Sequence, residues 1–206
     1  LYLRRNEVRG VQVVMAKPPA LVIGEDVFRG LFNREQRFVL GRALEMCRQS
    51  FLTVAALPPF DFMAFYEAIF HLGSLSEERQ GVADERLQQQ IDGWIEALDE
   101  LLLDEDRAKV RALVAECAQA FGDKRPTVVD WRQAAIAASL RVGIFLSGDP
   151  LVVLKRLLRE EERLRSPSIR AFDDMVLAME TSREIREVVH YLISEDFICA
   201  RRTLKG

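Results

Sequence analysis

The chain has 206 residues, of which 49% are hydrophobic and 30% are charged, a composition typical of a folded globular domain that excludes a disordered chain. Its 29 basic and 32 acidic residues give a net charge of −3 and are interspersed, which disfavours a nucleic-acid-binding protein. The uncharged runs are too short to cross a bilayer, so we expect no membrane span.

Cysteine usage and the first residues bear on the origin of the chain. Cys47, Cys117 and Cys199 lie far apart, form no CxxC pair and have apolar neighbours, so we expect three core thiols in a reducing, cytoplasmic compartment. The sequence begins at Leu1 and shows no signal-peptide pattern. We therefore expect one domain, residues 1–206, taken from a longer protein.

The first 24 residues predict a small β element. Apolar and polar residues alternate over residues 1–5 and 11–14, on either side of residues 6–10, which predicts a β-hairpin. A third short strand is expected after Pro18-Pro19 and comprises Ala20, Leu21, Val22 and Ile23.

Residues 25–206 predict a helical body. Asn33 with Gln36 forms a capping pattern before a helix over residues 34–49, and Pro58-Pro59 separates this helix from one over residues 61–71. Apolar residues at helical spacing on both sides of Asp104-Glu105-Asp106 predict a helical hairpin.

The second half of the chain continues in helices. Thr127 and Asp130 begin a long, nearly uncharged helix that ends at Gly148 and is expected to be central in the fold. Further helices are expected over residues 150–163, 168–179 and 182–193. The predicted fold class is mainly α with a small N-terminal β element, that is, α+β.

Residues 38–49, FVLGRALEMCRQ, have the rhythm of a zinc-binding helix. In the HExxH motif, two histidines four residues apart bind zinc from one helix face, and the glutamate between them is the general base. Here Arg42, Ala43 and Met46 stand at the places of His, Glu and His. The longer segment ALVIGEDVFRGLFNREQRFVLGRALEMC resembles the corresponding part of HtpX-like and CAAX-prenyl-protease-like zinc metallopeptidases.

A second segment supports this resemblance. These peptidases carry a glutamate zinc ligand on a downstream helix in a pattern like ExxADRxG, and WRQAAIAASLRVGIFLSGDP fits it with Arg141 and Gly143 in place. On this pattern the glutamate falls at Ile136 and a supporting aspartate at Leu140. The resemblance implies a zincin-like helical domain in which the helix over residues 34–49 packs against the helix over residues 127–147.

The residues at the family's zinc positions imply a domain without catalysis. None of them is a zinc ligand or a general base, so we expect no metal, no cofactor and no activity: these vestigial positions are Arg42, Ala43, Met46, Ile136 and Leu140. The resemblance then implies a protein-interaction or regulatory module within a larger bacterial protein, next to tetratricopeptide-type repeats. A protein partner is expected to add to the edge of the strand over residues 20–23, as substrates do in related peptidases.

Two alternatives remain open. FVLGRALEMCRQ is also the pattern of a core helix in a plain helical scaffold without peptidase ancestry. An enzyme of another class would use Glu45 or His71 at a relocated site, although neither His71 nor His190 has a usual zinc ligand three or four residues beyond it. GxSxG, P-loop and GxGxxG motifs are all absent.

Overall fold

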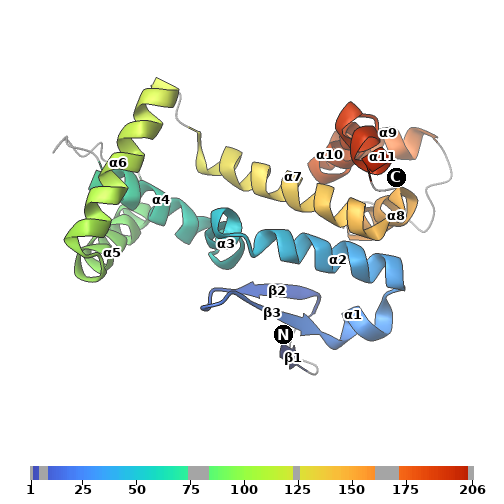
Figure 1. The fold of residues 1–206 in the computed structure, drawn as a ribbon, viewed down its shortest axis with the longest axis horizontal. Coiled ribbons are helices and arrows are strands. Elements are labelled where there is room, and N and C mark those ends of the chain that lie inside the picture. Colours follow the sequence, from blue (N-terminus) through green and yellow to red (C-terminus); the bar gives the residue numbers. More distant parts are fainter. Residues whose placement is uncertain (1, 5–8, 74–83, 123–125, 161–171, 204–206) are drawn as a thin grey trace. The chain divides into compact units, whose positions relative to one another are not determined.

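A computed structural model describes residues 2–4, 9–73, 84–122, 126–160 and 172–203. The predicted fold class is confirmed, because three short strands at the N-terminus are followed by a chain of helices (Figure 1). The chain divides into two compact units, residues 1–55 with 134–206, and residues 56–133. Each unit has an apolar cluster of its own, and the prediction of one domain over residues 1–206 stays a prediction.

The first unit begins with a three-stranded sheet. Strands β1 (Tyr2–Arg4), β2 (Val11–Val14) and β3 (Ala20–Gly24) are arranged in the order β1-β3-β2, with β3 parallel to β1 and antiparallel to β2. The predicted hairpin of residues 1–5 with 11–14 is therefore wrong, since both segments pair with β3. The most apolar strand takes the centre, where its neighbours cover it on both sides.

The position of β3 also corrects the predicted partner strand. Ala20, Leu21, Val22 and Ile23 belong to the central strand of the sheet: all four pair with β2, and Val22 and Ile23 also pair with β1. Leu21 and Ile23 are buried. A partner cannot add a strand here, because strand addition needs an unpaired edge.

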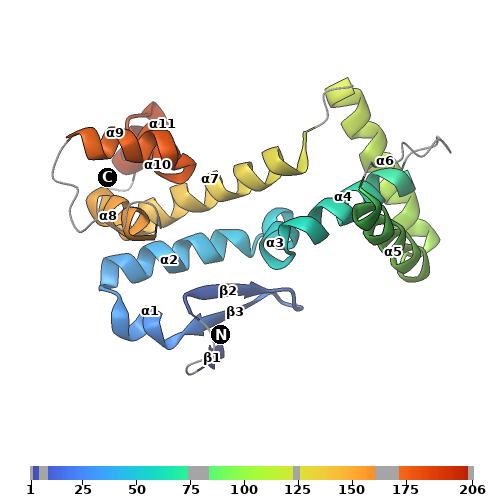
Figure 2. The same cartoon turned by 180° about the vertical axis from the view of Figure 1, so that it is seen from behind.

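Three helices follow the sheet: α1 (Glu25–Gly30), α2 (Asn33–Met46) and α3 (Gln49–Ala56). Both views show α2 beside the sheet (Figures 1 and 2), and the apolar cluster between them contains Leu21, Ile23, Val27 and Ala43. The N-cap of α2 is Phe32, whose N–H donates to Glu35 Oε2 at 3.1 Å. The predicted cap at Asn33 is thus one residue late.

The second part of this unit is helical. It contains the end of α7 (Val128–Ser147), then α8 (Pro150–Glu160), α9 (Phe172–Thr181), α10 (Arg183–Leu192) and α11 (Glu195–Thr203). The helix predicted over residues 168–179 starts outside the described residues, and α11 was not predicted. These helices share one apolar cluster with α2, made of Phe38, Leu140, Ile144, Val153, Leu157, Leu158, Ala178, Ile185, Val188 and Phe197.

The second unit contains the two helices predicted on either side of the acidic turn, and each of them packs against α4. It contains α4 (Pro59–Gly73), α5 (Glu85–Leu101), α6 (Asp104–Phe121) and the first residues of α7. Its apolar cluster joins α4 and α5 through Ala64, Ala68, Leu87 and Ile91. In the described part of the chain, no helix has the length and apolar character needed to cross a membrane.

Candidate functional site

Helices α2 and α7 pack against each other, as predicted from the two sequence segments. They run side by side in both views (Figures 1 and 2). A Cβ atom on Gly41 of α2 would lie 3.1 Å from the Cα of Gly143 on α7, and one on Gly143 would lie 2.7 Å from Phe38 Cδ2. The two glycines therefore allow a close approach of the backbones at the place where the resemblance puts the zinc site.

Arg42 occupies the first vestigial position, where it contacts an acid, an aromatic ring and the facing helix. Its Nη2 lies 3.0 Å from Glu184 Oε2 on α10, and its guanidinium carbon lies 5.6 Å from the ring centroid of Phe38. The methylene stem passes Gly143, since a Cβ there would lie 2.9 Å from Arg42 Cγ. With 24% of its side chain exposed, Arg42 is a partly buried cation paired with a carboxylate.

The other vestigial positions divide between two apolar clusters. Leu140 is buried in the cluster that contains Phe38, and Ile136 packs against the same cluster. Met46 is half-buried and, four residues after Arg42, lies on the same side of α2. Ala43 is buried in the cluster under the sheet. The structure therefore brings Arg42, Ile136 and Leu140 to one cluster and places Ala43 at another.

The residues considered for a relocated site are not gathered together. Glu45 forms an ion pair with Arg48 at 2.7 Å, while His71 lies in α4 of the second unit and the exposed His190 in α10 of the first. Within the described ranges, no three His, Cys, Asp or Glu side chains lie close enough to hold a metal ion. A zinc site with three ligands within these ranges would therefore require substitutions that introduce new ligands.

The cysteines only partly match the prediction. Cys47 and Cys117 are partly buried, whereas Cys199 is exposed, so the prediction of three core thiols is wrong for Cys199. Cys199 lies on a short terminal helix that buries little more than Phe197. Burial raises the pKa of the Cys47 thiol, which keeps it protonated and makes it a poor nucleophile.

Sequence reasoning missed a buried acid on α2. The side chain of Glu35 is 2% exposed and forms an ion pair with Arg159 of α8, in addition to accepting the Phe32 N–H. The sequence offered a signal in REQR, where an acid falls at the third residue of the helix. The ion pair ties the start of α2 to α8, and the hydrogen bond from Phe32 caps the helix one residue earlier than predicted.

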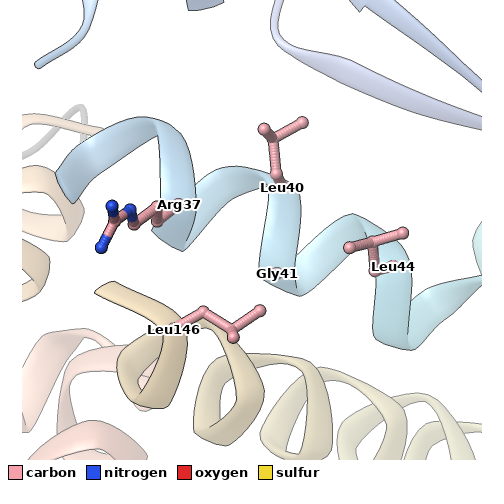
Figure 3. A pocket seen from close by; sticks show the side chains of 5 residues that line it. All are labelled: Arg37, Leu40, Gly41, Leu44 and Leu146. Atoms are coloured by element: carbon pink, nitrogen blue, oxygen red, sulfur yellow. The ribbon is translucent and has the colours of Figure 1, made fainter. Parts of the chain in front are cut away.

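A shallow groove between α2 and the end of α7 was also missed. It is lined by Arg37, Leu40, Gly41, Leu44 and Leu146 (Figure 3), and these five residues are named the α2 groove here. The sequence signal for this groove is a glycine inside an otherwise apolar helical pattern. Such a glycine marks a position at which another segment of the chain approaches the helix backbone closely.

Comparison of the chain with protein-family models, with curated proteins and with solved structures gives no match in any of the three.

Proposed function

We propose that this chain is a catalytically inactive relative of HtpX-like zinc metallopeptidases that serves as a protein-interaction or regulatory module in a larger bacterial protein. In this proposal the fold around α2 and α7 is retained, and the metal site is replaced by an ion pair with apolar packing. The function of such a domain is binding, because a zinc peptidase without ligands or a general base cannot activate water.

The observation that carries the proposal is the position of Arg42. A plain scaffold has no reason to place a cation at a glycine-mediated helix crossing, beside the two residues that the second segment puts at the glutamate and aspartate positions. Here Arg42 pairs with Glu184 at 3.0 Å and lies over Phe38, while Leu140 of the same cluster is 1% exposed. In this proposal, the charge of Arg42 and the apolar side chains near it thus occupy the positions at which the related peptidases hold zinc and its ligands.

Restoring ligands tests the proposal. The unchanged chain, purified without chelators, is expected to contain no stoichiometric zinc and to lack peptidase activity, and Arg42→His alone is expected to change neither. The triple variant Arg42→His/Met46→His/Ile136→Glu should bind Co²⁺ with the absorption spectrum of a tetrahedral site, because it supplies three ligands from two packed helices. The double variant Arg42→His/Met46→His is the matched control and should bind Co²⁺ more weakly.

Two outcomes contradict the proposal. Stoichiometric zinc in the unchanged chain, lost together with peptidase activity when His71 or His190 is replaced, would show a relocated active site. A triple variant that keeps the helical circular dichroism spectrum of the parent but binds Co²⁺ no better than the double variant would favour the plain scaffold.

A further inference from the structure

We propose that this chain associates with copies of itself, and that the α2 groove of one copy binds the turn between α5 and α6 of the next. The contact would use a side of α2 different from the one that carries Arg42, so it does not depend on the peptidase ancestry. The proposal rests on opposite, unpaired charges and exposed leucines in two places of the same chain.

The α2 groove combines an apolar surface with a free cation. Leu44 is 56% exposed and Leu146 is 44% exposed, and they flank Gly41, which contributes no side chain (Figure 3). Arg37 at the rim is exposed and has no ion-pair partner among the residues that the structure describes. The neighbouring Arg34 and Arg48 are paired with Asp149 and Glu45. Arg37 therefore remains available to a carboxylate of a partner.

The α5–α6 turn has the complementary character. Leu101 is 77% exposed and Leu103 is 71% exposed, on either side of the helix end at Leu102. Glu100 and Asp104 next to them are exposed and have no ion-pair partner in the described ranges. The other acids of this region are already paired with bases: Asp99 with Arg107, and Glu105 and Asp106 with Lys109. Two leucines and two free acids thus project from one turn.

The turn is also held in a fixed conformation before any partner binds. Arg107 Nε donates to the Leu102 carbonyl at 3.2 Å, and Arg107 Nη1 lies 2.6 Å from Asp99 Oδ1 on the other helix. A surface that is already ordered loses less conformational entropy on binding. Burial of the exposed leucines of both copies contributes hydrophobic free energy to binding. Ion pairs of Arg37 with Glu100 or Asp104 fix the orientation of the two copies.

Such a contact is heterologous, because it joins two different patches. Heterologous contacts form rings when the rotation closes and open chains when it does not, so the average mass should rise with concentration. Sedimentation velocity over a series of concentrations measures this directly. We expect masses above that of one chain, and dissociation at high salt because the charges at the rim are screened.

Charge reversal on each side gives the decisive test. Arg37→Glu in the groove and Glu100→Lys/Asp104→Lys in the turn should each weaken association at least about tenfold, since like charges then face each other. A mixture of the two variants should associate again, because each groove then meets a turn of opposite charge on the other variant. One of these contacts is the native one, and the other pairs the acid introduced at position 37 with the bases introduced at positions 100 and 104.

Matched controls place the same charge changes elsewhere on exposed helices. Arg202→Glu on α11 and the double variant Glu116→Lys/Glu180→Lys on α6 and α9 should associate like the unchanged chain. The proposal is overturned by an unchanged chain that keeps the mass of one chain up to its solubility limit, by groove or turn variants that associate normally, or by a mixture that does not associate. Control variants that associate as weakly as the test variants would also overturn the proposal, because the change in net charge would then explain the loss of association.

Discussion

At the scale of single residues, the close approach of α2 and α7 depends on two glycines. The space above Gly143 is limited by the backbone oxygen of Phe38, which would lie 2.9 Å from an added Cβ, and by Phe38 Cδ2 at 2.7 Å. A backbone atom in a helix cannot move aside as the end of a side chain can. The crossing therefore tolerates glycine at this place and no larger residue without a shift of a helix.

Gly143→Ala should destabilise the protein. The added methyl group overpacks the crossing, and we expect a loss of about 1–3 kcal/mol in the free energy of unfolding. Gly93→Ala is the matched control, because Gly93 lies inside α5 with no atom within 4 Å of an added Cβ. It should stabilise by about 0.5–1 kcal/mol through helix propensity. Urea denaturation followed by circular dichroism measures both, and a stabilising Gly143→Ala would contradict the close packing.

At the scale of elements, the ends of α8 and α2 are joined through Asp149. Its Oδ1 caps α8 by accepting the N–H groups of Leu151 at 3.1 Å and Val152 at 3.3 Å, and its other oxygen pairs with Arg34 of α2. The hydrogen bond from Val152, helped by Arg34 and Leu151, holds the pKa of this carboxyl below its usual value against the opposing effect of partial burial. One side chain thus both starts a helix and positions its neighbour.

The contribution of Asp149 to stability should depend on pH. Because its pKa is lower in the folded chain, the stabilisation is fully present above the unfolded value of about 4 and disappears as the pH falls through the folded value. Asp149→Ala should cost about 1 kcal/mol at neutral pH and less at acidic pH. Asp149→Asn keeps the cap without the charge, so it should cost less at every pH, and its cost should fall on acidification by the same amount, because neither variant titrates at this position. A cost of Asp149→Ala that stays the same from neutral to acidic pH in urea denaturation would contradict this role.

At the scale of the whole molecule, the two units have separate apolar clusters. Ile91 is buried between α4 and α5 in one unit, and Ile185 is completely buried among the helices around Phe38 in the other. Buried groups stabilise chiefly the elements that they contact, so each unit should have its own local unfolding free energy.

Truncating each isoleucine tests this division. Ile91→Ala should lose about 2–5 kcal/mol in its own unit, accelerate amide hydrogen exchange in α4, α5 and α6, and leave α8 and α10 unchanged. Ile185→Ala should show the reverse pattern. Hydrogen exchange read by mass spectrometry, segment by segment, separates the two results. Equal acceleration throughout the chain for either variant would mean that it unfolds as one cooperative body.

Local signals in the sequence determined most of the helices. The Thr127 and Asp130 pattern predicted the start of α7, where the Thr127 N–H donates to Asp130 Oδ2 at 3.0 Å and the Asp130 N–H donates to Thr127 Oγ1 at 3.2 Å. The helices α5 and α6 followed from helical periodicity on both sides of the acidic turn between them. These features depend on neighbours in sequence, so they are readable without the tertiary fold.

Only the tertiary structure decided which distant segments meet. It placed β3 at the centre of the sheet, because alternation along a strand selects a buried face but not the neighbouring strands. It paired Glu35 of α2 with Arg159 of α8, and it paired Arg42 with Glu184. Each of these contacts joins residues far apart in the chain, where no local spacing rule applies, so their geometry came from packing and not from pattern.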